Sequence, residues 1–406
     1  MDNPSVCDVK RLYDGRPLRS VTNFHKVTAM NLSKTLVSIS LLIASAGAWA
    51  QSPGVSDKEI LVGQFAAFSG PAAQLGERLK VGIEAYFKAT NAQGGVNGRT
   101  LKLVTRDDGY EPEKATAAVK ALIYEDKVFA LIGAVGTPTG LAAMPVFTAE
   151  KVPMIGMFTG AQALREPFNR QIFHVRASYF DETERIVQHV TSMGSKNIAV
   201  FYQNDAYGKA GLEGVNRALA KRDLKPVALA TFERNTVDVS ASLATILPTK
   251  PDAVIQIGAY KSVSAFIKES RKKGYGGQFF NVSFVGSKAL ADELGPVGTG
   301  VVISQVVPFP FAQAAPVVRE YQQRMGEAGQ KEFDFSSMEG FLMAKVFVEG
   351  VKRAGRNLSR EGLITALESM HDVNLGGFNI NYSAKSHEGS KFTDLSIIGR
   401  DSKFAH

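Results

Sequence analysis

Short apolar runs alternate with helical patterns along most of the chain. Residues 59–65 form the first apolar run, and the pattern after it repeats apolar side chains at Leu75, Leu79 and Ile83. This spacing of four residues places them on one face of a helix. The same alternation predicts strands at 101–106, 130–133, 151–155, 171–176, 197–202, 226–232, 253–258, 278–283 and 300–307, and near 376–382 and 393–399. It predicts helices at 112–125, 141–150, 181–193, 239–247, 262–273, 314–328, 335–354 and 361–369, and one between 208 and 226.

Two blocks of this pattern lie on either side of Arg176. Alternating strands and helices with apolar strands predict parallel sheets that are covered on both faces. A length of 406 residues favours two domains. We therefore expect an α/β fold with two doubly wound parallel-sheet lobes. The first block has few helices of its own, so we expect the helices after Pro308 to return to the first lobe.

Residues 130–163 read as strand, loop, helix, strand and loop. The loops at 136–139 and 158–161 follow the two strands, and ligands of open α/β sheets sit beyond the carboxyl ends of parallel strands. Each loop offers a hydroxyl and backbone amides, which could hold a carboxylate at a helix N-terminus. The alternative is that Gly, Pro and Thr only form tight turns here.

Residues 30–50 carry the three parts of a secretory signal peptide. A short basic start includes Lys34, residues 36–46 are apolar but too short to span a bilayer, and Ala48-Trp49-Ala50 fits the small-x-small cleavage pattern. A buried helix is the alternative. We expect cleavage before Gln51 and export to the periplasm. We interpret residues 1–29 as an upstream extension that is absent from the mature protein, with translation starting at Met30.

Composition and motifs exclude several function classes. The net charge of +8 is spread out, with no basic block longer than Arg271-Lys272-Lys273, whereas a nucleic-acid interface needs a concentrated stripe. The only cysteine is Cys7, so the mature chain would have no thiol for disulfides or metals. The sequence has none of the H-E-x-x-H, G-x-S-x-G, Walker or strand-associated G-x-G-x-x-G motifs. We expect no metal, no cofactor and no catalysis; a secreted enzyme using Asp107, Asp108 or His174 is the weaker alternative.

Several motifs in order resemble the type I periplasmic solute-binding proteins of ABC importers, specifically the leucine/isoleucine/valine-binding (branched-chain amino acid) family. They are residues 65–76, 91–98, 107–108, 132–133, 204–208 and 339–344, and the similarity spans 56–399. The resemblance implies two lobes joined by a three-crossover hinge, near Arg176, Val307 and Asn379, that closes on a ligand as a Venus-flytrap. The N-terminal lobe would comprise 51–176 and 308–378, and the C-terminal lobe 177–307 and 379–406.

The resemblance also implies ligand-binding residues. In the first lobe, Thr137 matches a ligand-binding hydroxyl, and the second contact loop offers a carbonyl at Phe158 and an amide at Gly160. The remaining residues that we expect at the site are Gly136, Thr159, Tyr207, Tyr260 and Ser283, with Phe68 and Tyr110 as further walls. Tyr207 and Tyr260 match positions that close over the ligand. Core packing is the alternative for each aromatic side chain.

Two positions depart from the family pattern. Ser283 stands where amino-acid binders often carry a glutamate for the ammonium group, and Leu75 stands where they carry a tyrosine. Leaving a buried ammonium without a charged partner costs a few kcal/mol. Either Asp205 or Glu339 replaces the glutamate, or the ligand has no amine.

The expected function is that of a periplasmic receptor, a monomer that delivers a small carboxylate-bearing solute to an inner-membrane ABC permease. A branched-chain or related amino acid is the first candidate ligand, and an aromatic or aliphatic carboxylate or an amide is the second. A ligand-sensing subunit of the same fold is a close variant.

Overall fold

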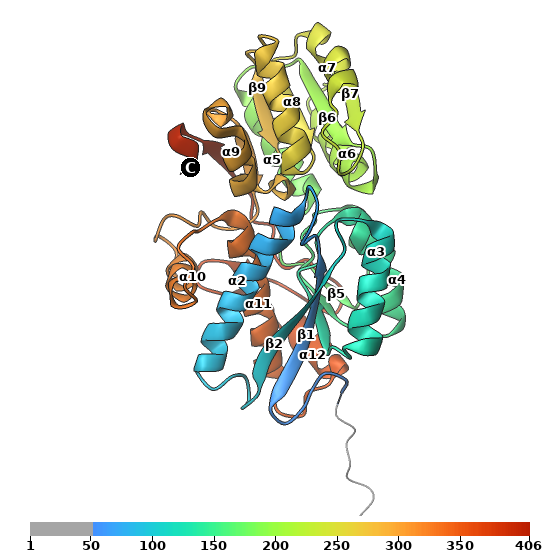
Figure 1. Ribbon diagram of the computed structural model, residues 1–406, viewed down its shortest axis with the longest axis vertical. Coiled ribbons are helices and arrows are strands. Elements are labelled where there is room, and N and C mark those ends of the chain that lie inside the picture. Colours follow the sequence, from blue (N-terminus) through green and yellow to red (C-terminus); the bar gives the residue numbers. More distant parts are fainter. Residues whose placement is uncertain (1–51) are drawn as a thin grey trace, which may run out of the picture. The chain divides into compact units, whose positions relative to one another are not determined.

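The computed structural model describes residues 52–406, so the predicted signal peptide and upstream extension lie outside the described residues. Residues 51–406 form one compact unit. It contains two separate large sheets, one parallel and one mainly parallel, with helices packed against them, which confirms the predicted α/β fold with two parallel-sheet lobes (Figure 1).

The first lobe is built on a five-stranded parallel sheet in the order β2-β1-β3-β4-β5. Strand β1, next to the edge strand β2, pairs with β2 through Val62 and Leu103, and with β3 through Val62 and Ala130. Val62 and Ala130 are fully buried because helices cover both faces of the sheet. The strands are β1 (Glu59–Ala66), β2 (Thr100–Asp107), β3 (Ala130–Ile132), β4 (Met154–Ile155) and β5 (Ile172–Phe173).

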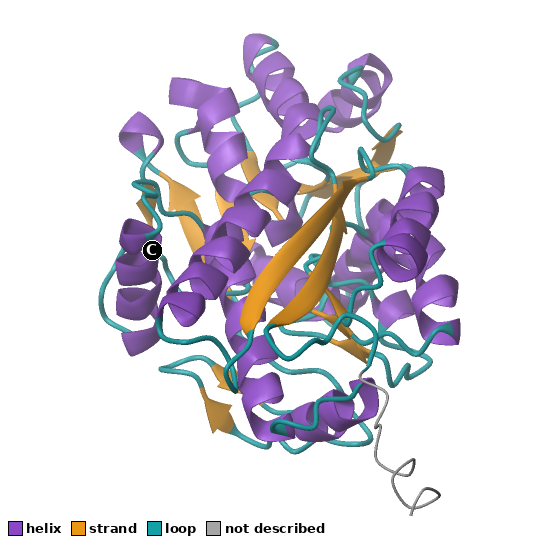
Figure 2. Cartoon of the chain, turned by 60° about the horizontal axis from the view of Figure 1, so that its bottom comes forward, coloured by secondary structure: helices purple, strands orange, loops and turns teal. Residues whose placement is uncertain are grey.

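Helices flank this sheet on both sides (Figures 1 and 2). On one side α2 (Ala73–Ala92) lies along α11 (Phe335–Ala354), and on the other α3 (Pro112–Lys120) packs with α4 (Thr137–Ala149). Glycines let α2 and α11 approach closely, because a Cβ on Gly82 would lie 1.8 Å from the Ser337 carbonyl oxygen. Further elements along the chain are α10 (Pro316–Glu327), α12 (Arg360–Glu368) and the paired short strands β11 (Val373–Asn374) and β12 (Asn379–Ile380).

The second lobe has a seven-stranded sheet in the order β14-β13-β10-β9-β8-β6-β7. Strands β6 (Ile198–Gln203), β7 (Ala228–Phe232), β8 (Ala253–Ile257), β9 (Gln278–Asn281) and β10 (Val302–Gln305) are parallel. The antiparallel strands β13 (Asp394–Ile398) and β14 (Phe404–Ala405) complete it.

Neighbouring residues of β9 show how this sheet is covered. Phe279 contacts Phe266 with ring centroids 6.3 Å apart, and Phe280 contacts His189 at 6.1 Å. Side chains alternate between the faces of a strand, so the helices that carry Phe266 and His189 lie on opposite faces. They are α8 (Tyr260–Lys272) and α5 (Tyr179–Ser192); the other helices are α6 (Ala206–Ala220), α7 (Ser240–Ile246) and α9 (Ser287–Leu294).

Three segments connect the lobes. The first joins β5 to α5 through Arg176, and the second joins β10 to α10 through Val307. Beyond Asn379 the backbone still bonds to the first lobe, since Gly389 donates to the His174 carbonyl over 2.8 Å. The chain pairs with the second sheet only at β13. These contacts favour a third crossover just before β13, and the lobe boundaries stay a prediction.

The predicted start of the helix after β3 is wrong. Residues 136–139 were expected to form a loop before a helix at 141–150, but α4 begins at Thr137. Proline is favoured in the first turn of a helix because its φ is already helical, and Pro138 lies there. Gly136, with φ of 106°, turns the chain into the helix. Thr137 therefore lies in the first turn of α4 rather than in a free loop.

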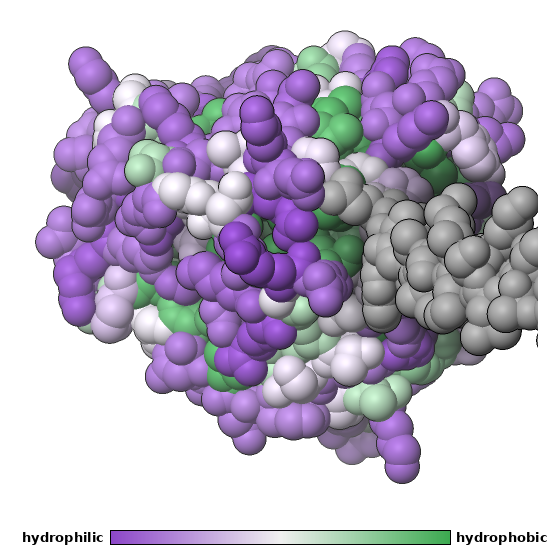
Figure 3. All heavy atoms as spheres, turned by 90° about the horizontal axis from the view of Figure 1, so that it is seen from below, coloured by the Kyte–Doolittle hydropathy of each residue, from purple (hydrophilic) through white to green (hydrophobic). Residues whose placement is uncertain are grey.

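On the face drawn in Figure 3, the surface of the described residues is mostly polar. On the face of Figure 3, hydrophilic residues cover most of the area and hydrophobic residues form separated small patches. Between residues 52 and 406, no helix is long and apolar enough to cross a membrane.

Candidate functional site

Two buried threonines meet beyond the ends of β3 and β4. The hydroxyl oxygens of Thr137 and Thr159 are hydrogen-bonded at 2.6 Å, and Thr159 also bonds to the hydroxyl of Tyr179 at 3.3 Å. Within the part of the chain that the structure describes, no side chain caps the N-terminus of α4, where the positive end of the helix dipole lies. The first turn of α4 and the loop after β4 therefore offer hydroxyls and helix amides together, which suits an anionic group.

The second contact loop packs directly on the start of α5. Tyr179 donates its backbone N–H to the Gly160 carbonyl over 2.8 Å. A Cβ on Gly160 would lie only 2.6 Å from that Tyr179 nitrogen, so the position has no room for a side chain. The ring of Phe158 lies 5.1 Å from the guanidinium carbon of Arg176. The loop thus brings a first-lobe aromatic ring to the crossover between the lobes.

Five buried rings form what we call the aromatic cluster: Tyr110, Phe158, Tyr179, Tyr207 and Phe284. Phe284 of the second lobe is central, with ring centroids 4.4 Å from Tyr207, 5.6 Å from Phe158 and 5.8 Å from Tyr110. Tyr207 lies 5.5 Å from Tyr179. Since Tyr110 and Phe158 belong to the first lobe, the cluster joins the two lobes.

Two tyrosine hydroxyls in the cluster differ in their partners. Gln203 donates to the Tyr110 hydroxyl over 3.2 Å. The Tyr207 hydroxyl is buried and has no hydrogen-bond partner within residues 52–406. Burial raises the pKa of both tyrosines well above the usual value, so both are neutral donors. The Tyr207 hydroxyl is free to bond with a ligand.

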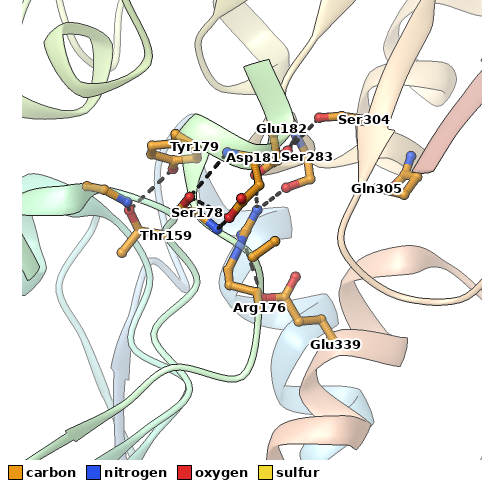
Figure 4. A network of polar contacts seen from close by, with 12 residues as sticks. Thr159, Arg176, Ser178, Tyr179, Asp181, Glu182, Ser283, Ser304, Gln305 and Glu339 are labelled. Atoms are coloured by element: carbon orange, nitrogen blue, oxygen red, sulfur yellow. Dashed lines mark hydrogen bonds and ion pairs between the residues drawn. The ribbon is translucent and has the colours of Figure 1, made fainter. Parts of the chain in front are cut away.

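A buried polar network adjoins the cluster at the first crossover (Figure 4). Arg176 Nη2 donates to Glu182 Oε1 over 2.8 Å and also bonds to the Ser283 hydroxyl. Glu182 Oε2 accepts from the Ser283 amide at 2.7 Å and from the Ser304 hydroxyl at 2.5 Å. Glu339 Oε1 lies 3.6 Å from Arg176 Nη1. Both charges of the Arg176–Glu182 pair are therefore hydrogen-bonded, as a buried ion pair requires.

Glu339 is the carboxyl group of this network whose Oε1 accepts no hydrogen bond from the described residues. It is almost completely buried on α11, and burial raises the pKa of Glu339 to about 7, with Arg176 acting in the opposite direction. The proton occupancy of Glu339 is consequently sensitive to its surroundings near neutral pH.

The other predicted site residues fall into different places. Gly136 packs against the ring of Tyr110, since a Cβ on Gly136 would lie 2.3 Å from a ring carbon of that tyrosine. Tyr260 accepts a long 3.5 Å hydrogen bond from the Gln74 amide of α2. Phe68 is only partly buried and lies outside the aromatic cluster, 6.0 Å from the Lys80 ammonium. The ligand-binding role of each of these residues stays a prediction.

Three residues of the site had no predicted ligand-binding role: Arg176, Tyr179 and Phe284. Phe284 directly follows Ser283 at a strand end, and this position beyond a parallel strand was the available signal. Tyr179 begins α5 immediately after the crossover. Their contacts depend on how the lobes meet, which no local pattern in the sequence reports.

A family model described as periplasmic binding protein matches residues 59–393. The chain belongs to this family of periplasmic binding proteins. Leu/Ile/Val-binding protein homolog 7 of Brucella abortus is 24% identical over 387 residues, which cover 91% of this chain and 94% of the relative. The crystal structure of a possible leucine/isoleucine/valine-binding protein from Rhodopirellula baltica is 34% identical, with a TM-score of 0.82, covering 87% of this chain and 97% of that one. An ABC transporter solute-binding protein from R. palustris, in complex with benzoate, matches with a TM-score of 0.76 at 22% identity, over 86% and 95% of the two chains.

This periplasmic binding protein is thus an ABC transporter solute-binding protein, in a family of binding proteins and not of enzymes. The three residues of the weaker alternative make local hydrogen bonds to the backbone. Asp107 accepts the backbone amides of Phe68 and Gly109, and Asp108 accepts that of Tyr110. His174 Nε2 is hydrogen-bonded to the Leu164 carbonyl at 3.1 Å. Among residues 52–406, no group of His, Cys, Asp and Glu could hold a metal ion.

Asp205 is engaged elsewhere in this binding protein. It caps α6 by accepting the amides of Tyr207 and Gly208, and its other oxygen accepts from Gln203 and pairs with Arg234 at 3.3 Å. Ser283 is likewise occupied by Arg176 and Glu182. Of the two predicted replacements for the family glutamate, only Glu339 retains an unpartnered oxygen.

Proposed function

We propose that this protein captures a small solute with one carboxylate and an apolar body between its lobes and delivers it to an inner-membrane ABC permease. The observation that carries the proposal is the packing of Phe284 from one lobe against Phe158 and Tyr110 from the other. Rings that meet across two lobes enclose an apolar body when the lobes close over it.

The carboxylate end of the ligand is assigned to the start of α4. Thr137 and Thr159 place two hydroxyls beside the uncapped helix N-terminus. An anion there gains charge-assisted hydrogen bonds and the favourable end of the helix dipole. This arrangement supports a carboxylate more strongly than a cationic or a neutral polar group.

We propose further that the ligand is an amine-free acid. Glu182 already accepts three hydrogen bonds, and Asp205 is held by α6 and Arg234. A buried ammonium would therefore depend on Glu339, which lies beside the positive charge of Arg176. The R. palustris protein with bound benzoate supports an aromatic acid as an example of this class.

A branched-chain amino acid is the second candidate ligand. It is favoured by the names of the relatives and by the unpartnered Oε1 of Glu339. The signal-peptide pattern of residues 30–50 supports export to the periplasm, where such a receptor would meet both its ligand and the permease.

The test uses a pair of ligands that differ in the amine alone. Mature protein, residues 51–406, is unfolded and refolded to remove carried-over solute, and its melting temperature is measured with 4-methylpentanoate and with leucine. Benzoate extends the series to an aromatic acid. We expect the two amine-free acids to raise the melting temperature, since a ligand at a hundredfold excess over Kd stabilises by about 2.7 kcal/mol. A rise with leucine alone would contradict the amine-free class and support the amino acid.

A further inference from the structure

A hydrogen-bond donor and an acceptor face each other unpaired in the buried network. Arg176 Nη1 and Glu339 Oε1 are 3.6 Å apart, and neither atom has a hydrogen-bond partner within residues 52–406. Both residues are almost fully buried. A direct hydrogen bond between nitrogen and oxygen spans about 2.7–3.2 Å, so this gap is too wide for one. Buried polar groups are normally satisfied, which indicates that the pair is built for a further partner.

The pair lies at the edge of the aromatic cluster. The guanidinium carbon of Arg176 is 5.1 Å from the Phe158 ring and 5.9 Å from the Tyr179 ring. Its Nη2 atom is committed to Glu182 and Ser283, so the Nε and Nη1 atoms remain available. In Figure 4, Thr159 lies on one side of Arg176 and Glu339 on the other. Because Thr159 is part of the proposed carboxylate subsite, this subsite and Glu339 lie on different sides of Arg176.

The chemistry of the two atoms selects one kind of group. A hydroxyl both accepts and donates, so it can accept from Arg176 Nη1 and donate to Glu339 Oε1. A carboxylate has no proton to donate to Glu339 Oε1, and an ammonium has no lone pair that could accept from Arg176 Nη1, so each would leave one of the two buried atoms unpaired. A methyl group would leave both buried atoms unsatisfied.

We propose that Arg176 and Glu339 form a second polar subsite that recognises a hydroxyl group, so that the ligand is a hydroxylated acid with its hydroxyl remote from the carboxylate. This inference rests on the proposed function, because the carboxylate end is bound by Thr137, Thr159 and α4. Glu339 acts as a specificity-determining residue: its Oε1 accepts a hydrogen bond from the ligand hydroxyl, while Arg176 Nη1 donates one to the hydroxyl oxygen. The Tyr207 hydroxyl, also unpartnered, supplies a further polar atom in the same cluster.

The test compares acids that differ by one hydroxyl. Binding of 4-hydroxybenzoate and benzoate, and of 6-hydroxyhexanoate and hexanoate, is measured by calorimetry with the mature chain at pH 8, above the pKa of Glu339. We expect the hydroxylated member of at least one pair to bind about tenfold or more tightly. The parent acid has no hydroxyl and would leave the two buried atoms of the subsite without hydrogen bonds. Glu339→Leu should reduce this preference to within about twofold while changing the Kd of the parent acid by less than about threefold.

Two further variants separate specificity from folding. Glu339→Gln keeps an acceptor oxygen in the same volume and should retain part of the preference even if Glu339→Leu folds poorly. Glu349→Leu, on the same helix but paired with Arg353 at the surface, should retain all of it. Equal binding within both pairs by the unmodified protein, or a preference that survives Glu339→Leu, overturns the hydroxyl subsite alone. Binding of leucine with no binding of any of the four acids overturns the proposed function and the subsite with it.

Discussion

Asn235 of the second lobe donates a hydrogen bond from Nδ2 to Glu111 Oε1 of the first lobe over 2.7 Å. The same nitrogen donates to the Gly109 carbonyl at 3.2 Å, and Arg234 Nη2 donates to Glu111 Oε2 at 3.0 Å. These bonds connect the loop after β7 with the loop after β2. All three bonds run between the lobes, and Glu111 accepts two of them, so separation of the lobes would break them.

The first prediction concerns this cross-lobe contact. Glu111→Ala removes the acceptor for both Asn235 and Arg234, so we expect ligand to dissociate faster and Kd to rise about three- to tenfold. Stopped-flow dissociation and calorimetry measure the two quantities. Glu113→Ala, at an exposed position on α3, is the matched control and should leave both unchanged. A dissociation rate that is the same in Glu111→Ala and the unmodified protein would show that the contact does not hold the lobes together.

The second prediction concerns the central ring of the aromatic cluster. Phe284→Ala removes contacts with Tyr207, Phe158 and Tyr110 at once, and we expect the Kd for the ligand to rise about a hundredfold or more. Phe284→Leu keeps most of the apolar volume and should cost less than about tenfold. Calorimetry with both variants measures the difference. Equal losses in the two variants would mean that the ring geometry of Phe284 is not used.

The third prediction concerns the carboxylate subsite. Thr159→Val keeps the shape of the side chain but removes the hydroxyl that bonds to Thr137 and Tyr179. We expect affinity for a carboxylate ligand to fall about tenfold, and Thr159→Ser to restore most of it. A neutral amide analogue of the same acid serves as the comparison. If the amide loses as much affinity as the carboxylate, the hydroxyl does not act on the charge.

The lobes could be predicted because each βα unit carries its own pattern. The pattern of apolar runs and helical spacing predicted the bounds of β1 and α11 to within one residue of those observed. The parallel sheets then follow from general packing rules. The start of α4 was missed because Thr137, Pro138 and Thr139 favour turns as well as first helical turns, and only the tertiary setting decides between them.

Within the site, only the residues that follow neighbouring strands could be predicted to lie together. Thr137 and Thr159 could be expected to lie close together, since their loops follow neighbouring parallel strands. The meeting of Phe284 with Phe158 could not, because these residues come from different lobes and share no local pattern. The pairing of Arg176 with Glu182 likewise depends on burial of both charges, which the chain achieves only when the crossover packs against α5 and β10.

The fourth prediction concerns two glycines with different surroundings. Gly160→Ala would bring a Cβ within 2.6 Å of the Tyr179 backbone nitrogen, so the loop or α5 must shift. We expect it to destabilise the fold by about 2–4 kcal/mol and to weaken ligand binding. Gly326→Ala, in α10 with nothing near the new Cβ, should instead stabilise by about 0.5–1 kcal/mol. Urea unfolding of the two variants measures both changes, and a neutral Gly160→Ala would show that this contact is loosely packed.

The last prediction concerns Asp108, which is completely buried on the first lobe. Burial raises the pKa of Asp108 to about 7, against the opposing hydrogen bond from the Tyr110 amide. Between about pH 4 and 7 the folded state retains a proton that the unfolded state has lost, so the contribution of Asp108 to the free energy of unfolding falls as pH rises through this window and is constant above it. Asp108→Asn removes the cost of ionising this buried carboxyl group. We expect its free energy of unfolding to exceed that of the unmodified protein by an amount that rises from about 1 kcal/mol at pH 5 to about 4 kcal/mol at pH 8. Urea unfolding at both pH values measures this gain, with the exposed Asp223→Asn as the control that should show none; a gain that does not depend on pH would mean that Asp108 is ionised throughout.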